Sequence, residues 1–285
     1  MRATGEEFDI TVRSHRLHAQ RYGSPSAPLV FGVHGLSGNM KSFDFVGERL
    51  GGDALQLVAL DLRGRGKSET TPPGTYGWEN HALDVFAVAD ALGFELFSVI
   101  GQSMGGSVAI KAAELDGSRL DAIVLVDVAG RVDRGVGPVI ASVIRRVDTV
   151  HGSVEGYVYA VKAEGLVEPW SEYWDRFYRY QLKEGDGGVR SRAHHEAVAE
   201  DRKYTATQHP YDRWKHLTMP TLLLRATREL LPGSGHVVPA ADRDRFRREV
   251  RCGVIVEVDA NHLTINMHPH TATATASFLV DVLGR

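Results

Sequence analysis

The most constraining feature of this sequence is the segment Gly-Gln-Ser-Met-Gly at residues 101–105. A short apolar run, typical of a buried strand, ends at this segment, and a helical pattern follows it. In a strand–turn–helix setting this spacing indicates a nucleophile elbow, a tight turn that exposes a central hydroxyl. Glycine at 101 and 105 avoids side-chain clashes in such a turn, and the start of the helix favours developing negative charge. We therefore expect Ser103 to be an exposed and strained serine.

Around this segment, short apolar runs alternate with helical patterns along most of the chain. Runs rich in Val, Ile and Leu are typical of strands buried on both faces, as in a parallel sheet. Their alternation with helices predicts the α/β class, with a mostly parallel central sheet, flanking helices and right-handed crossovers. The expected strands are 28–34, 55–61, 97–101, 120–128, 221–226 and 254–258, and the expected helices are 42–50, 78–92, 104–115, 240–249 and 271–283.

Residues 131–217 do not follow the alternation and contain no convincing buried strand. Aromatic residues recur there at helical spacing, which predicts a helical cap over a core formed by 1–130 and 218–285. These aromatic side chains form the core of the cap, or in part line a ligand pocket. Trp170 and Trp174 are the candidates for the pocket wall.

Composition excludes several classes of protein. The 285 residues include 33 Lys and Arg against 36 Asp and Glu, which argues against a dedicated nucleic-acid binder. The single cysteine, Cys252, allows no intrachain disulfide and no cysteine-based zinc site. No apolar run is long enough to span a membrane, and the first residues do not resemble a secretion signal. We expect a soluble, cytoplasmic protein whose partner is a small-molecule substrate, with no nucleic acid or membrane partner.

Motifs for cofactors and metals fail on inspection. No Gly-x-Gly-x-x-Gly segment follows a strand, so nothing indicates a nicotinamide or flavin. The triplet Gly66-Lys67-Ser68 ends like a phosphate-binding loop, but Asp61 stands where that motif needs glycine. His195-Glu196 begins like a zinc-protease helix, but Ala199 stands where the second histidine is required. We expect no cofactor and no metal.

Four motifs together resemble the α/β-hydrolase superfamily, specifically members with a helical cap inserted after the sixth strand. They arrive in the family's order and cover nearly the whole chain. They are His34-Gly35 after a strand, the segment 61–68, the elbow at 101–105, and Asn261-His262 near the C-terminus. The motifs are specific for the fold and much less so for the substrate.

The resemblance implies roles for individual residues. Ser103 corresponds to the nucleophile, which needs an adjacent base. His262 corresponds to that base because it follows the last expected strand and precedes the last helix, with His268 as a rival nearby. The oxyanion hole is implied to be the backbone N–H groups of Leu36 and Met104. His34 is expected to shape the oxyanion loop.

Two carboxylates fit the acid that orients the histidine, and the order Ser–acid–His allows either. Glu229 follows the run 221–226 at the usual family position and is the preferred candidate. It departs from the usual Gly-x-x-Asp because Ala226 replaces the glycine and glutamate replaces the aspartate. Asp127, after the preceding strand, matches the place where other members carry the acid. Asp259 is expected to be a neighbour of the histidine only.

The resemblance implies a cofactor-free serine hydrolase that cleaves a small carboxylic ester or lactone through an acyl-enzyme. Serine at the elbow argues against epoxide hydrolase and haloalkane dehalogenase chemistry, which uses a carboxylate nucleophile. Two alternatives stay open: a carbon–carbon bond hydrolase of a diketone-type substrate with the same triad, and a non-catalytic small-ligand binding protein or receptor. Many soluble relatives form dimers, so a homodimer is possible.

Overall fold

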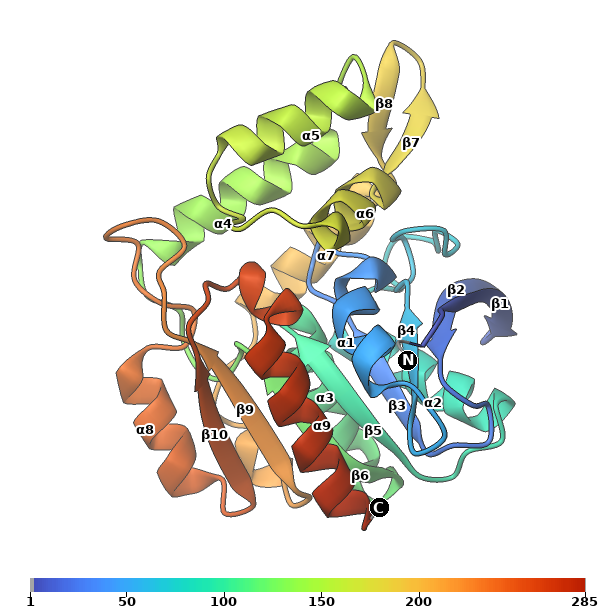
Figure 1. The fold of residues 1–285 in the computed structure, drawn as a ribbon, viewed down its shortest axis with the longest axis vertical. Helices are drawn as coiled ribbons and strands as arrows, with labels where there is room; N and C mark the ends of the chain where they lie inside the picture. The colour runs from blue at the N-terminus through green and yellow to red at the C-terminus, as the bar shows by residue number, and fades with distance from the viewer. Residues whose placement is uncertain (1–2, 285) are drawn as a thin grey trace.

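The computed structural model describes residues 3–284 and centres on an eight-stranded sheet (Figure 1). The strand order is β1-β2-β4-β3-β5-β6-β9-β10; β2 is antiparallel to both its neighbours, and the other pairs are parallel. The mostly parallel α/β sheet is thus confirmed. The strands are β1 (Glu6–Val12), β2 (His15–Tyr22), β3 (Leu29–Val33), β4 (Gln56–Leu60), β5 (Phe97–Gln102), β6 (Leu120–Val126), β9 (Thr221–Ala226) and β10 (Gly253–Val258).

Sequence reasoning missed the two N-terminal strands. β1 lies at the edge of the sheet and is largely exposed, so it lacks the continuous apolar run by which the other strands were found. Its Phe8, Ile10 and Val12 alternate with polar residues, the pattern of an antiparallel strand with one face on the core. This alternation was the signal that could have revealed it.

Five helices cover the two faces of the sheet, close to where they were expected. The helices α1 and α9 pack on one face, and α2, α3 and α8 pack on the other. Among residues 3–284, no helix has the length and apolar character needed to cross a bilayer. The helix bounds are α1 (Asp44–Leu50), α2 (Trp78–Ala91), α3 (Met104–Asp116), α8 (Ala240–Glu249) and α9 (Pro269–Leu283).

The chain between β6 and β9 forms four helices and a small hairpin. Figure 1 shows α4, α5, α6 and the hairpin above the end of the sheet at which the parallel strands terminate. The hairpin was not expected, because its strands have only four residues each and are joined through an Asp186-Gly187 turn. The elements are α4 (Val136–Arg145), α5 (Val154–Ala163), α6 (Glu172–Tyr180), β7 (Leu182–Gly185), β8 (Gly188–Ser191) and α7 (His195–Ala206).

The helix α7 is attached to the core by a buried ion-pair cluster. Asp201 on α7 is fully buried, and its carboxylate accepts hydrogen bonds from Arg65 Nη2 at 2.6 Å and from the Gly77 amide at 2.6 Å. His81 Nε2 lies 2.9 Å from the same carboxylate. The division into a core of 1–130 and 218–285 and a cap of 131–217 stays a prediction, and α7 contacts the core directly.

We expect Asp201→Asn to lower the free energy of unfolding by roughly 3–5 kcal/mol at pH 7, because it leaves the buried Arg65 without its partner. Burial alone would raise the pKa of Asp201, but His81, Arg65 and the Gly77 amide together hold it below its usual range. A carboxylate with a lowered folded-state pKa stabilises the protein above its unfolded pKa of about 3.9 and loses this contribution as the pH falls. Urea unfolding from pH 7 to pH 3 should therefore show a steeper decline for wild type than for Asp201→Asn.

The matched control is Asp186→Asn, at an exposed position in the hairpin turn. A surface substitution of this kind should change stability by less than about 0.5 kcal/mol at every pH. Equal losses in the two variants would contradict the structural role assigned to Asp201.

Candidate active site

Ser103 occupies the turn between β5 and α3 in a strained backbone conformation. Its φ of 53° and ψ of −121° lie in a region that residues other than glycine rarely adopt. A Cβ on Gly101 would lie 2.3 Å from the Gly105 carbonyl oxygen, and one on Gly105 would lie 1.9 Å from the Val33 carbonyl oxygen. No side chain fits at either position, so the two glycines allow the close approach that forms the turn.

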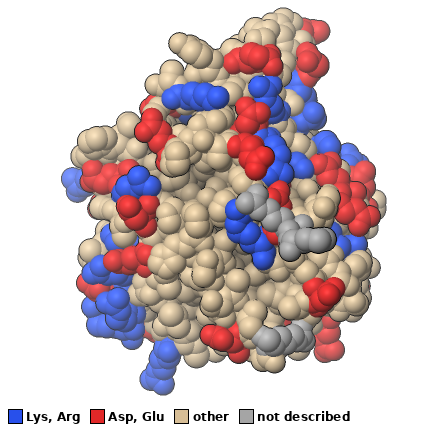
Figure 2. Space-filling view, in the orientation of Figure 1, with Lys and Arg blue, Asp and Glu red and all other residues tan. Residues whose placement is uncertain are grey.

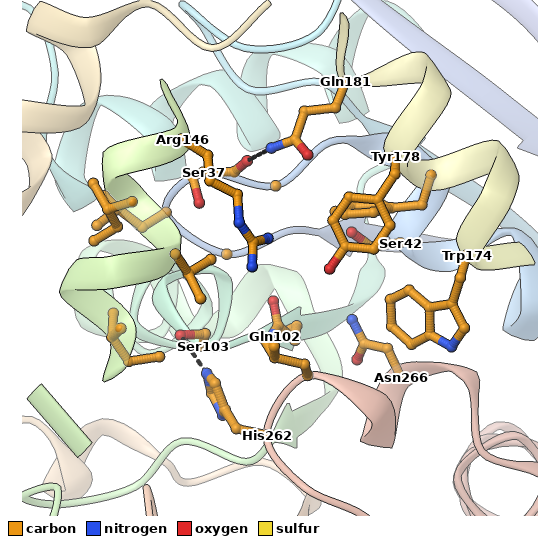
Figure 3. Close-up of a pocket in the computed structure, with 18 of the residues that line it drawn as sticks. Ser37, Ser42, Gln102, Ser103, Arg146, Trp174, Tyr178, Gln181, His262 and Asn266 are labelled. Atoms are coloured by element: carbon orange, nitrogen blue, oxygen red, sulfur yellow. Dashed lines mark hydrogen bonds between the residues drawn. The ribbon is translucent and has the colours of Figure 1, made fainter. Parts of the chain in front are cut away.

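Parallel strands bring three polar side chains together where they end. Ser103 follows β5, Asp127 follows the neighbouring β6, and His262 follows β10. His262 Nε2 lies 3.1 Å from Ser103 Oγ, the contact drawn in Figure 3, and His262 Nδ1 lies 2.9 Å from Asp127 Oδ2. Asp127 is 1% exposed, and its other oxygen accepts a hydrogen bond from the Ala226 amide at 2.9 Å. A hydrogen-bonded chain thus runs from a buried carboxylate to an accessible hydroxyl.

The structure corrects the preference for Glu229 as the partner of His262. The Glu229 carboxylate accepts hydrogen bonds from the amides of Gly233 at 2.6 Å and Gly235 at 3.1 Å. The loop after β9 turns back on itself, and Glu229 supplies the acceptors for its amides. Asp127, the alternative, contacts His262 because a positive φ of 50° turns it out of the end of β6.

The remaining carboxylate and histidine candidates lie in other contacts. His268 precedes α9, and its Nδ1 accepts a hydrogen bond from the His270 amide. Asp259 is 83% exposed and pairs with Arg228 at 3.3 Å. Neither contact reaches Ser103, so the geometry favours His262 over the rival histidine.

The expected oxyanion loop lies beside Ser103, where the strand order reverses between β3 and β5, the usual position of a site in open α/β sheets. Leu36 lines the same cavity as Ser103, and Met104 is the first residue of α3, whose first amides lack an acceptor within the helix. His34 is fully buried between the Gly35 carbonyl at 2.7 Å and the Leu62 amide at 3.1 Å. Burial lowers the pKa of His34 to about 3, so the neutral ring anchors the loop.

Two cavities meet at Ser103 and His262. The smaller, of about 100 Å³, extends toward α6 and includes Trp174 and Tyr178 in its wall, as Figure 3 shows. The larger, of about 630 Å³, is lined mainly by apolar side chains and extends between α4 and α7. Ile140 and Ile144 on α4 line both cavities, so this helix forms the wall between them.

One of the two tryptophans predicted to line the pocket does so. Trp174 lines the smaller cavity, whereas Trp170 lies before α6 and stacks on Tyr178, with ring centroids 5.5 Å apart. The expectation for Trp170 is therefore wrong, because the residue precedes the helix and faces a separate hollow beside Lys162. Sequence reasoning missed Arg146, which lines the smaller cavity, because no motif surrounds it.

Comparison with known proteins places the chain in a family. The sequence model of the α/β hydrolase fold matches residues 28–268, so the chain belongs to that family. N-formylmaleamate deformylase from Pseudomonas putida is 37% identical over 42% of this chain and 44% of its own length. The zebrafish (Danio rerio) serine hydrolase-like protein is 34% identical over 46% of this chain and 40% of its own. The alignments thus span less than half the length of these relatives.

Solved structures share the fold across nearly the whole chain. The crystal structure of E-2-(acetamidomethylene)succinate hydrolase has a TM-score of 0.84 and 19% identity, and the match covers 99% of this chain and 100% of that one. The thioesterase domain from the curacin biosynthetic pathway has a TM-score of 0.76 and 17% identity, with 97% and 99% covered. At this identity, the similarity concerns the fold alone.

Proposed function

We propose that this member of the α/β-hydrolase family is a serine hydrolase that cleaves a small carboxylic ester or lactone. The observation that carries this proposal is the chain of hydrogen bonds from Asp127 through His262 to Ser103, which ends at a hydroxyl facing two cavities. A serine hydroxyl is a weak nucleophile on its own and becomes reactive when an oriented base takes its proton.

In this mechanism Ser103 Oγ attacks the substrate carbonyl carbon while His262 Nε2 takes the hydroxyl proton. Asp127 holds the proton on His262 Nδ1 and stabilises the imidazolium that forms. The backbone N–H groups of Leu36 and Met104 stabilise the negative oxygen of the tetrahedral intermediate, and His262 returns the proton to the leaving group. Water then attacks the acyl-enzyme with His262 again as base, which releases the acid and restores Ser103.

The same triad would serve the carbon–carbon bond hydrolase, so the first substrate panel should contain diketones as well as esters and lactones. A relative named N-formylmaleamate deformylase supports adding formamides to that panel. Location in the cytoplasm and assembly into a homodimer stay proposals.

The direct test is intact-mass spectrometry after treatment with a fluorophosphonate, a probe that needs an activated serine and little substrate recognition. We expect one adduct on the wild-type protein and none on Ser103→Ala. Ser107→Ala is the matched control, since Ser107 lines the larger cavity close to Ser103 on α3, and it should still be labelled. Absence of an adduct on folded wild-type protein would contradict the proposal and favour the non-catalytic binding protein.

A further inference from the structure

The smaller cavity contains an arginine for which the proposed triad has no use. Arg146 follows α4, only 11% of its side chain is exposed, and Figure 3 shows its guanidinium directed into the cavity that contains Ser103. A guanidinium keeps its charge at all relevant pH values, and burial of such a charge is costly unless it is paired. This cation therefore needs a counter-charge or a bound anion.

Arg146 is held in place from its outer side. Its Nε donates to Glu164 Oε1 at 3.1 Å and its Nη2 donates to Glu164 Oε2, an arrangement that fixes the plane of the guanidinium. Glu164 follows α5 and its side chain is 38% exposed, so water screens its charge. The Glu164 carboxylate thus orients Arg146 from the solvent side. Because its charge is screened, it does not fully cancel the positive charge that Arg146 presents to the cavity.

The other groups around the guanidinium are neutral. Burial raises the pKa of Tyr157 and of Tyr178 although Arg146 opposes the shift, so both phenols stay protonated. Burial, together with Arg146, lowers the pKa of His151, which keeps that imidazole uncharged at pH 7. The residues of 3–284 that line this cavity include no aspartate or glutamate. Within residues 3–284, Arg146 is thus the only Lys, Arg, Asp or Glu in the wall of the cavity that contains the nucleophile.

We propose that Arg146 binds a carboxylate of the substrate, so that the preferred ester or lactone carries a short, negatively charged arm. This inference rests on the proposed function of Ser103 and names the substrate class for that site. The small volume near Arg146 limits the length of the charged arm, while the larger cavity on the other side of Ser103 accepts the remainder of the substrate. Apolar side chains form most of the wall of that larger cavity, although Arg131, Arg202 and Arg213 also line it. A planar guanidinium matches a carboxylate in shape and charge, and the low dielectric of a partly buried site strengthens their attraction.

The test compares para-nitrophenyl hydrogen succinate, glutarate and adipate with their neutral methyl esters, with release of nitrophenolate as the readout. For the arm length that wild type prefers, the ester with the free carboxylate should have a kcat/KM about 10- to 100-fold above that of its methyl ester. This factor corresponds to the free energy that charge-assisted hydrogen bonds supply. In Arg146→Gln this preference should disappear, so that the kcat/KM values of the charged and the neutral ester agree within about 3-fold. Arg146→Lys should retain part of it.

Glu164→Gln separates recognition from a merely structural ion pair. It removes the counter-charge but keeps the cation and one side-chain oxygen that can still accept a hydrogen bond from it, so the preference for the charged ester should remain. Equal loss of preference in Glu164→Gln and Arg146→Gln would overturn the proposal, and so would a wild-type enzyme indifferent to charge at all three arm lengths.

Labelling of Ser103 distinguishes failure of this inference from failure of the proposed function. Glutarate should slow fluorophosphonate labelling of wild type and have no effect on Arg146→Gln. If wild type is labelled and glutarate does not slow the labelling, the role of Arg146 is overturned but the proposed hydrolase function is not. Absence of labelling overturns both.

Discussion

Replacing His262 with alanine is expected to lower kcat by roughly 10⁶-fold on the best ester of the panel, with KM changed little. His262 Nε2 is the only base within hydrogen-bonding distance of Ser103 Oγ among the described contacts, at 3.1 Å. Without it, the hydroxyl proton has no acceptor during attack and the leaving group has no donor. Because Ser103 and His262 act as a unit, the double variant with alanine at both positions should be no slower than either single variant.

The matched control for this measurement is His268→Ala, which removes the rival histidine six residues further along the chain. The His268 ring accepts a hydrogen bond from the His270 amide and lines neither cavity at Ser103, so kcat should stay within about 3-fold of wild type. Equal melting temperatures for wild type and the two variants would show that the loss is chemical. A His262→Ala enzyme with more than a tenth of wild-type activity would exclude this histidine as the base.

Asp127→Asn is expected to lower kcat by about 10⁴-fold while the protein stays folded. Asparagine keeps a side-chain oxygen that can accept the hydrogen bond from the Ala226 amide, so this contact after the end of β6 is preserved. Its amide donor, however, favours the tautomer of His262 that places the proton on Nε2, where it can no longer accept one from Ser103. The fold-change should be measured at saturating substrate, because the defect lies in the chemical step.

Glu229→Gln is the paired control and tests the position that the sequence favoured. Its side-chain oxygen still accepts from the Gly233 or Gly235 amide, so we expect activity within about 3-fold of wild type. The assignment of the acid would reverse if Glu229→Gln lost activity as severely as Asp127→Asn does. Partial losses of similar size in both would show that neither carboxylate alone orients the histidine.

The two cavities give these measurements a common structural basis. Ser103 stands where they join, and Arg146 lies in the smaller one. Changes in the triad should affect charged and neutral esters alike, because they act on the carbonyl carbon. A change at Arg146 should lower the activity on charged esters relative to neutral ones, so the two kinds of variant separate catalysis from substrate recognition.

The sequence by itself determined the α/β class and the positions of Ser103 and His262. Buried parallel strands need long apolar runs, and a nucleophile elbow needs small residues on both sides of its serine, so both leave local patterns. The contact between Gly105 and the Val33 carbonyl shows why the pattern is strict. The edge strand β1 left only a weaker alternation, and the hairpin β7–β8 is too short to leave a pattern of its own.

Only the tertiary structure showed that Asp127 contacts His262 while Glu229 does not, and that Trp174 lines the smaller cavity while Trp170 does not. Both carboxylates follow a strand that ends near Ser103, and local sequence does not record which way a side chain turns after a strand. The positive φ of Asp127 and the loop amides that Glu229 binds settle that direction. The sequence likewise gave no sign of Arg146, because its ion-pair partner Glu164 follows a different helix between β6 and β9. Such pairings arise when distant segments pack, and no local pattern encodes them.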